Sequence, residues 1–225
     1  MVVANGENSA GGFGITPEIA EELFGLGIHV ITTGNHIWDK KEIIPYIPRQ
    51  KMLLRPANYP PGVPGCGSVV VSAPSGENLG IINVNGRVFM DALLDCPFRG
   101  VDAELEKMKG KTKAVLVDIH AEATSEKMTM GWHLDGRVSA VVGTHTHGHA
   151  ADERILPKGT AFISDVGMTG PLDSSIGIDK SQALEKFLTQ MPRKFDIPKN
   201  DIELNGVIID IDAESGLSRS ISRVK

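Results

Sequence analysis

The chain has 225 residues, 41% hydrophobic and 23% charged, and its 28 Asp and Glu against 23 Lys and Arg leave a net charge of −5. This composition is typical of a globular protein and excludes the coiled-coil, collagen-like and intrinsically disordered classes. The sequence lacks the basic clusters of a protein that binds duplex nucleic acid, and no apolar run approaches the ~18 residues that cross a membrane.

The length predicts a single domain covering residues 1–225, because globular domains commonly hold about 100 to 200 residues. No linker or internal repeat divides the chain. The N-terminus has neither the basic nor the apolar region of a secretory signal, which predicts a cytoplasmic protein. The sequence is also compatible with a homo-oligomer.

The first predicted elements form a parallel crossover. Apolar residues 2–4 and 29–33 are typical of strands buried on both faces. Between them a helix is predicted, with Thr16 as its N-cap, Pro17 as its first residue and Gly25 near its end. The strand, helix, strand order predicts an α/β fold.

The remaining elements add further strands, helices and two hairpins. Strands are predicted at 114–119 and 138–142, and helices at 102–109 with Asp102 as cap, at 124–130 and at 181–190, where Ala183, Leu184, Phe187 and Leu188 form one apolar stripe. Hairpins are predicted from strands 67–73 and 79–84 around the turn 74–78, and from strands 206–212 and 218–224. Parallel units combined with hairpins predict a mixed α/β fold with more than one sheet layer.

Metal-competent side chains follow four of the predicted strands. The candidates are Glu7 and Asn8, then Asn35 and His36, then His120, and finally His145 and His147. In open α/β sheets a ligand binds beyond the carboxyl ends of the strands. We therefore expect these side chains to meet in one crevice. Asp165 also follows an apolar run, and it could orient a histidine of this group.

Each candidate also has a simpler interpretation. His145 and His147 would share one face of an extended chain and reach the same cluster, but such a pair can also be ordinary surface histidines. Asn35 and His36 could diverge, one toward metal and one toward substrate, or form an ordinary turn. Glu7 could bridge two cations or be a solvated carboxylate.

The donor types indicate a particular chemistry. Oxygen and imidazole donors without thiolates favour hard or borderline divalent metals. Two such ions ~3.5–4 Å apart can clamp the attacking and leaving oxygens of a phosphoester and lower the pKa of a shared water. His36, adjacent to a ligand candidate, would then protonate the leaving oxygen as general acid.

Several strings resemble the YmdB family of calcineurin-like metallophosphoesterases. They are Ala-Asn-Gly-Glu-Asn-Ser-Ala-Gly-Gly (4–12), Thr-Gly-Asn-His-Ile-Trp-Asp-Lys-Lys-Glu-Ile (33–43), Leu-Arg-Pro-Ala-Asn-Tyr-Pro (54–60), His-Ala-Glu-Ala-Thr-Ser-Glu-Lys (120–127), Gly-Thr-His-Thr-His (143–147) and Asp-Val-Gly-Met-Thr-Gly-Pro (165–171). The resemblance extends from residue 1 to the C-terminus. Six strings spread over the chain make it highly specific.

The resemblance implies a fold and a reaction. The fold is an α/β sandwich of two stacked mixed β-sheets flanked by helices, and the reaction is hydrolysis of small phosphodiesters such as 2′,3′-cyclic nucleotides with two divalent metal ions (Mn, Fe, Mg or Zn). Glu7 matches the bridging carboxylate, and Asn35, His120 and His145 match the ligands of one metal. By the same match His147 would bind the other metal, Asn8 would line the site as a candidate ligand, and His36 would be the proton donor.

One departure from the family pattern leaves alternatives open. Family members begin with a strand ending in Gly-Asp, whose Asp binds the first metal, and a helix then leads to the strand that here holds Val2 and Val3. We therefore expect a domain truncated at its N-terminus relative to the family. Two alternatives follow: a regulatory protein that binds metal or nucleotide with little turnover, and a phosphomonoesterase that uses the same metals.

Overall fold

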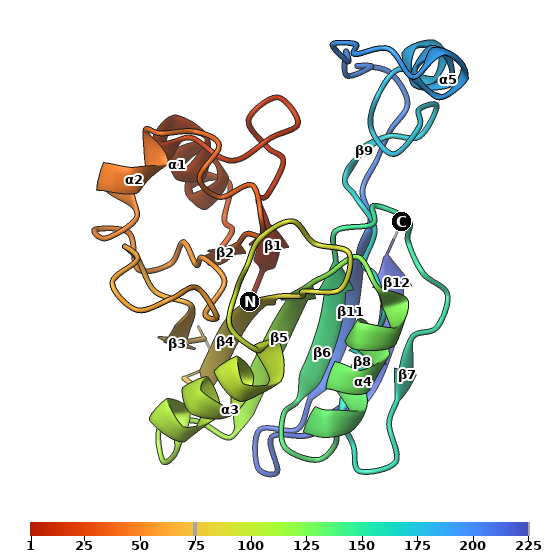
Figure 1. Ribbon diagram of the computed structural model, residues 1–225. Coiled ribbons are helices and arrows are strands. Elements are labelled where there is room, and N and C mark those ends of the chain that lie inside the picture. The colour runs from red at the N-terminus through yellow and green to blue at the C-terminus, as the bar shows by residue number, and fades with distance from the viewer. Residues whose placement is uncertain (74–75, 225) are drawn as a thin grey trace.

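The computed structural model describes residues 1–73 and 76–224, and a six-stranded mixed sheet lies at its centre (Figure 1). Its order is β3 (Ser68–Ser72), β4 (Asn78–Asn85), β5 (Ala114–His120), β6 (Ala140–Thr144), β8 (Ala161–Ile163) and β7 (Arg154–Ile155). The inner strands β4, β5, β6 and β8 run parallel, while β3 and β7 are antiparallel edges. The carboxyl ends of the parallel strands therefore share one edge, as the sequence predicted.

The predicted N-terminal crossover is confirmed. Strands β1 (Val3–Asn5) and β2 (Val30–Thr32) pair in parallel, with Val3 opposite Val30. Helix α1 (Pro17–Gly25) connects them, and the hydroxyl of Thr16 accepts a hydrogen bond of 3.4 Å from the N–H of Ile19. Thr16 is thus the N-cap that the sequence indicated, because its side chain satisfies a free amide of the first turn.

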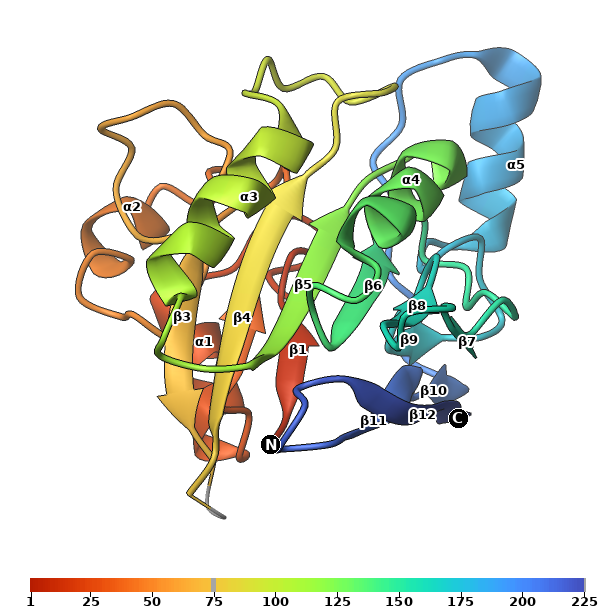
Figure 2. The ribbon, with the colours of Figure 1, turned by 90° about the horizontal axis from the view of Figure 1, so that it is seen from below.

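The two sheets are stacked between helices, so the predicted sandwich is confirmed, except that the small sheet is parallel and only the large sheet is mixed. Val30, Leu54 and Ile81 are fully buried where the β1–β2 sheet faces the large sheet. Helices α1 and α2 (Ile43–Tyr46) pack on the outer side of the small sheet, around Ile31. On the other side, α3 (Pro97–Met108) and α4 (Thr124–Leu134) cover the large sheet (Figure 2), around Val117.

Two helix predictions need correction. Helix α3 begins at Pro97, and its N-cap is Cys96, so Asp102 lies inside the helix and does not cap it. The reason is that Pro97 fills the first helical position, where its fixed φ and missing N–H cost nothing. The carboxylate of Asp102 instead binds His133 and Arg137. Helix α4 extends to Leu134, four residues beyond its predicted end at 130.

Both predicted hairpins are confirmed. β3 and β4 are antiparallel, and of the predicted turn 74–78, residues 74 and 75 lie outside the described residues. β11 (Gly206–Ile211) and β12 (Ser218–Val224) form the second hairpin, which reaches the large sheet through the Ser218 hydroxyl, 2.8 Å from the Ser139 carbonyl oxygen.

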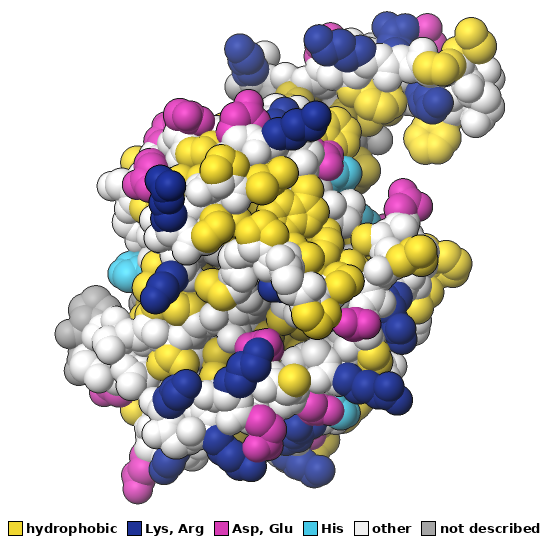
Figure 3. Space-filling model, turned by 60° about the vertical axis from the view of Figure 1, so that its left-hand side comes forward, with side chains coloured by type: hydrophobic (Ala, Val, Ile, Leu, Met, Phe, Trp, Pro, Cys, Tyr) yellow, Lys and Arg dark blue, Asp and Glu magenta, His cyan; other side chains and the backbone are white. Residues whose placement is uncertain are grey.

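An outlying arm, residues 168–204, projects from the body and carries β9 (Gly170–Pro171), α5 (Lys180–Thr189) and β10 (Ile202–Glu203) (Figures 1 and 3). The apolar stripe predicted on α5 exists, but Phe187 and Leu188 are each 75% exposed and only Ala183 is buried. Hydrophobic side chains therefore remain on the surface of the arm. Across the described residues, no helix combines the length and apolar character that a membrane crossing requires.

Candidate functional site

Four of the predicted site residues meet at the carboxyl ends of the strands. Glu7 follows β1, Asn35 follows β2, His120 ends β5, and His145 follows β6. Glu7 and His120 are 3% and 1% exposed, so these two residues of the cluster are buried below the protein surface. The topology brings these residues together because the four strands point the same way.

The Glu7 carboxylate is only partly satisfied by hydrogen bonds. Its Oε1 accepts a 2.6 Å hydrogen bond from the N–H of His36 and lies 3.4 Å from Nε2 of His120. Its buried Oε2 has no hydrogen-bond partner among the residues that the structure describes. Burial alone would raise the pKa of Glu7, but the protonated form of His120, which brings a positive charge and an Nε2–H donor, and the N–H of His36 lower it below its ordinary value.

Gly34 gives the carboxylate its space. A Cβ at this position would lie 2.3 Å from Oε2 of Glu7 and 2.2 Å from Cδ2 of His120. Any side chain there would displace one of the two residues. The glycine before Asn35 is thus required by close packing, since the φ angle does not demand it.

The tautomer of His120 follows from its neighbours. The hydroxyl of Thr144 donates to Oδ1 of Asp118 at 2.8 Å, so it is free to accept from Nδ1–H of His120 at 3.0 Å. With the proton on Nδ1, the lone pair of Nε2 faces the cluster. Asp118 is itself buried, which raises its pKa, and hydrogen bonds from Thr32, Asn5 and Thr144 oppose that rise.

His145 completes the cluster. Its Nε2 lies 3.2 Å from Oε2 of Glu122, and its Nδ1 lies 3.1 Å from Nε2 of His120. Burial and the neighbouring His120 lower the pKa of His145 to about 4. The imidazole is therefore neutral near pH 7, and with its proton on Nε2 toward Glu122, its Nδ1 lone pair points at His120.

Asn35 brings a fourth donor, since its Oδ1 lies 3.1 Å from Nε2 of His120. When His120 is neutral, lone pairs of a carboxylate, an amide and two imidazoles therefore face one another. Two donor atoms that each bind one ion at ~2.0–2.2 Å lie about 3 to 3.6 Å from each other. The distances from His120 Nε2 to the donor atoms of Asn35, His145 and Glu7 are 3.1 to 3.4 Å and fall in this range.

The chemical types of these donors fit a divalent cation, although each of the short contacts joins one residue to Nε2 of His120. Within residues 1–73 and 76–224, no three His, Cys, Asp or Glu side chains already surround a common metal-sized space. The unpartnered Oε2 of Glu7 is what a cation would satisfy. A buried carboxylate oxygen without a donor is costly unless a positive charge completes it.

The other predicted ligands form a second group. Nδ1 of His147 lies 2.8 Å from the carbonyl oxygen of Ile176 in the arm, to which it donates, so its Nε2 accepts from Nδ2 of Asn8 at 2.9 Å. Oδ1 of Asn8 is buried, and within residues 1–73 and 76–224 no group forms a hydrogen bond with it. This pair lies next to the first cluster because Asn8 follows Glu7 in the chain.

The prediction that His145 and His147 share one face of an extended chain is wrong. Both residues have left-handed backbone, with φ of +102° and +66°, and their side chains contact different groups. The physical reason is the intervening Thr146. Its N–H and hydroxyl donate to Oδ2 of Asp165 at 3.0 and 2.6 Å, which folds the loop back toward β8.

Asn35 and His36 diverge as expected. While Asn35 faces His120, the ring of His36 turns toward Asp39, with Nδ1 2.8 Å from Oδ2 of that carboxylate. The side chain of His36 is 30% exposed, and its Nε2 has no hydrogen bond to the described residues. His36 is therefore placed at the mouth of the cluster, with one nitrogen available to a bound molecule.

Sequence reasoning missed the groups that hold the cluster in place. Asp118 lies within an apolar strand, and this one charged residue in the run Ala114–Ile119 was the available signal. Asp165 was a candidate for orienting a histidine, but its Oδ2 binds Thr146 and, at 2.8 Å, the buried ammonium of Lys127. Lys127, 1% exposed on α4, gave no signal in the sequence.

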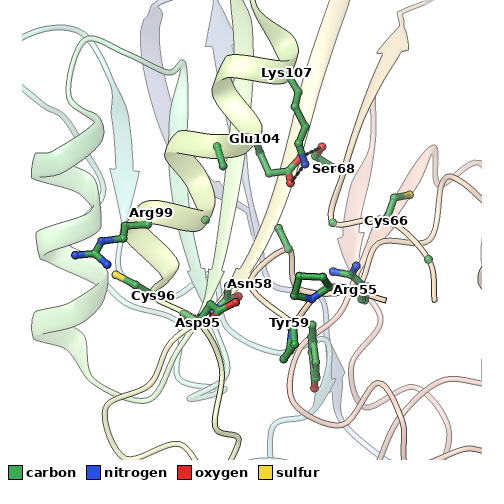
Figure 4. Close-up of a pocket in the computed structure, with 17 residues that line it drawn as sticks. Arg55, Asn58, Tyr59, Cys66, Ser68, Asp95, Cys96, Arg99, Glu104 and Lys107 are labelled. Atoms are coloured by element: carbon green, nitrogen blue, oxygen red, sulfur yellow. Dashed lines mark hydrogen bonds and ion pairs between the residues drawn. The ribbon is translucent and has the colours of Figure 1, made fainter. Parts of the chain in front are cut away.

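A separate hollow lies away from these donors. A groove of about 790 Å³ runs between α3 and the segment 55–68 (Figure 4). Arg55, Tyr59 and Glu104 line it, as do the free thiols Cys66 and Cys96, and none of the predicted site residues does. The metal-competent donors and this groove are thus separate features of the molecule.

Comparison with known proteins places this geometry in a family. The 2′,3′-cyclic-nucleotide 2′-phosphodiesterase of Bacillus subtilis is 47% identical over 224 residues, which cover 100% of this chain and 84% of that protein. A hypothetical protein from Thermus thermophilus has a crystal structure with a TM-score of 0.92 and 42% identity, covering 100% of this chain and 86% of that one. The crystal structure of a novel phosphatase from Mycoplasma pneumoniae has a TM-score of 0.91 and 33% identity, covering 100% of this chain and 81% of that one. The family model described as YmdB-like protein matches residues 1–224, and the chain belongs to this family.

Proposed function

We propose that this protein is a metal-dependent phosphodiesterase that opens the ring of 2′,3′-cyclic nucleotides at the 2′ oxygen. The observation that carries the proposal is the convergence of lone pairs on His120 Nε2, with donor atoms 3.1 to 3.4 Å away and the buried Oε2 of Glu7 unpartnered. The activity for which the Bacillus subtilis relative is named, at 47% identity, supports the choice of substrate. Phosphoesterases of this family use divalent metals, and the neutral and anionic donors here suit such ions.

Two divalent ions, of Mn, Fe, Mg or Zn, are proposed at the site. Asn35, His120 and His145 would hold one ion, Glu7 would bridge both, and His147 with Asn8 would hold the other. Bound there, divalent cations would polarise the phosphoryl oxygens and lower the pKa of the attacking water. In this proposal residues 1–225 act as one metallophosphoesterase domain.

The proposed reaction is an attack by water on phosphorus with O2′ as the leaving group, and His36, positioned by Asp39, acts on the leaving group. Water adds its oxygen to phosphorus, the bond from phosphorus to O2′ breaks, and the product is a nucleoside 3′-phosphate. His36 donates its Nε2 proton to the departing O2′, which avoids a free alkoxide and contributes about 10²- to 10⁴-fold to the rate. Asp39, whose Oδ2 lies 2.8 Å from Nδ1 of His36, holds the ring in place.

Hydrolysis with product identification tests the proposal. The protein loaded with Mn²⁺ should convert 2′,3′-cyclic AMP into 3′-AMP, read by ³¹P NMR, and His36→Ala should lower kcat by about 10²- to 10⁴-fold. The same variant should bind Mn²⁺ as the parent does. Absence of turnover, or turnover that His36→Ala and Asn35→Ala leave unchanged, would contradict the proposal.

A phosphomonoesterase is the second candidate, because the Mycoplasma pneumoniae neighbour with 33% identity is described as a phosphatase. A monoester carries a second negative charge and needs no opened ring, so 3′-AMP is the informative substrate. Rapid release of inorganic phosphate from 3′-AMP, with slow opening of the cyclic diester, would favour this candidate. A regulatory protein is the third, and it predicts bound Mn²⁺ and nucleotide with no turnover of either substrate.

A further inference from the structure

Phe13 lies beside His36 and has no part in the proposed chemistry. The ring centroids of the two side chains are 5.0 Å apart and their planes meet at 75°, an edge-to-face contact. Phe13 is 53% exposed, so one side of a large apolar ring faces solvent at the mouth of the cluster. Exposed aromatic side chains at such a position are suited to bind a planar ligand.

The loop that carries Phe13 is held firmly. Gly12 and Gly14 flank the ring with φ of +95° and +71°, a backbone region in which other residues are strained. A Cβ on Gly14 would lie 3.0 Å from the carbonyl oxygen of His36, so the loop packs tightly against the segment after β2. The amide of Ala10 closes the loop by donating to the carbonyl of Gly14 at 2.9 Å. The backbone conformation and packing of the loop therefore determine the position of Phe13.

The arm adds a second apolar group at the same place. The side chain of Ile197 lies so close to Gly12 that a Cβ there would be 3.4 Å from its Cδ1. Ile197 is 42% exposed. Two partly exposed apolar side chains, Phe13 of this loop and Ile197 of the arm, thus lie at or next to the loop that packs against the segment of His36.

We propose that Phe13, with Ile197, forms the subsite that binds the nucleobase of the substrate. The proposal rests on the proposed function, in which His36 protonates O2′. The base is joined to C1′, the carbon next to the one that carries O2′, so a base must lie within a few ångströms of the proton donor. The exposed ring next to His36 is the group it would meet, and stacking on an aromatic ring tolerates every base.

A binding measurement tests this subsite independently of turnover. Adenosine 3′-monophosphate and ribose 3-phosphate, the latter locked as its methyl β-furanoside, share the furanose phosphate and differ at C1′, where a methoxy group replaces the base. Their Kd values are measured calorimetrically on the Mn²⁺-loaded protein. Phe13→Ala should weaken binding of the nucleotide by about 5- to 150-fold and that of ribose 3-phosphate by less than about 2-fold. Phe13→Trp should restore the nucleotide affinity. Phe187→Ala, which removes a 75% exposed ring from α5, is the matched control.

The outcomes separate the two proposals. Loss of affinity confined to the nucleotide supports the base subsite, even if 2′,3′-cyclic AMP is not hydrolysed and the proposed function fails. Equal losses for both ligands would overturn it, because Phe13 would then act through His36 or the loop. An unchanged nucleotide Kd in Phe13→Ala, or a parent protein that binds both ligands equally or binds neither, would overturn it as well.

Discussion

The strand-end cluster and the outlying arm are built by opposite means. In the cluster, charged and polar side chains are almost fully buried, as shown by Glu7 and Asp165 at 3% exposure and Lys127 at 1%. On the arm, apolar side chains are exposed, with Phe187 and Leu188 each at 75%. Buried polar groups need defined partners, so the contacts of the cluster are set within this chain. The apolar face of α5 has no cover in the described structure, so packing within the chain does not set its role.

Left-handed backbone at residues other than glycine occurs in both regions, at His145 and His147 beside the cluster and at Ile176, Gln190 and Asp201 on the arm. His145 and His147 both adopt left-handed φ values, which are unfavourable for residues other than glycine. The Asp165 carboxylate holds Thr146 between them and is itself paired with Lys127. The strain is thus supported by a buried ion pair, and changes to that pair should affect the protein far more than changes to the arm.

The largest expected effect comes from Lys127→Met. It leaves the buried carboxylate of Asp165 without its cation, so the free energy of unfolding should fall by about 3 to 5 kcal/mol, measured by urea denaturation. The double variant Lys127→Met, Asp165→Asn should recover part of this loss, because no buried charge remains. Leu188→Ala on the arm should change stability by less than about 0.5 kcal/mol. If Lys127→Met and Leu188→Ala lowered the free energy of unfolding equally, the proposed difference between the cluster and the arm would be contradicted.

A smaller effect is expected from Thr144→Val. The change removes the hydroxyl that accepts from His120 Nδ1–H and donates to Asp118, so the imidazole loses its fixed orientation. Affinity for Mn²⁺, measured calorimetrically, should fall by about 10- to 100-fold. Thr144→Ser keeps the hydroxyl and should stay close to the parent. If valine and serine bind Mn²⁺ equally well, the hydroxyl does not orient His120.

The smallest effect belongs to the surface. Burial would raise the pKa of Asp102, but hydrogen bonds from Arg137 and His133 lower it below its ordinary value of 3.8. Because the folded pKa is depressed, this carboxylate stabilises the fold above that pH, and the contribution disappears as the pH falls through the lowered pKa. Asp102→Asn should therefore cost less than about 1 kcal/mol at pH 7 and nothing in strong acid. A loss that persists at pH 2 in calorimetric melts would disprove the electrostatic origin.

The sequence predicted the crossover, both hairpins and the meeting of strand-end side chains, because these follow from apolar periodicity and turn residues. It failed where a local signal was ambiguous. Asp102 resembled a cap, yet Pro97 began α3 five residues earlier. Asp118 was hidden inside an apolar run because its partners Asn5, Thr32 and Thr144 come from three other segments. The apolar stripe of α5 was read correctly, but periodicity does not tell whether another element covers it.

The central claim is that the lone pairs around His120 hold the cation on which hydrolysis depends. The direct test compares the parent with His120→Ala after Mn²⁺ loading and desalting, measuring bound manganese by elemental analysis and turnover of 2′,3′-cyclic AMP on the same samples. We predict that His120→Ala retains less manganese per chain and loses at least about 100-fold in turnover, while Phe187→Ala matches the parent in both. Full manganese content together with undiminished turnover in His120→Ala would contradict the account.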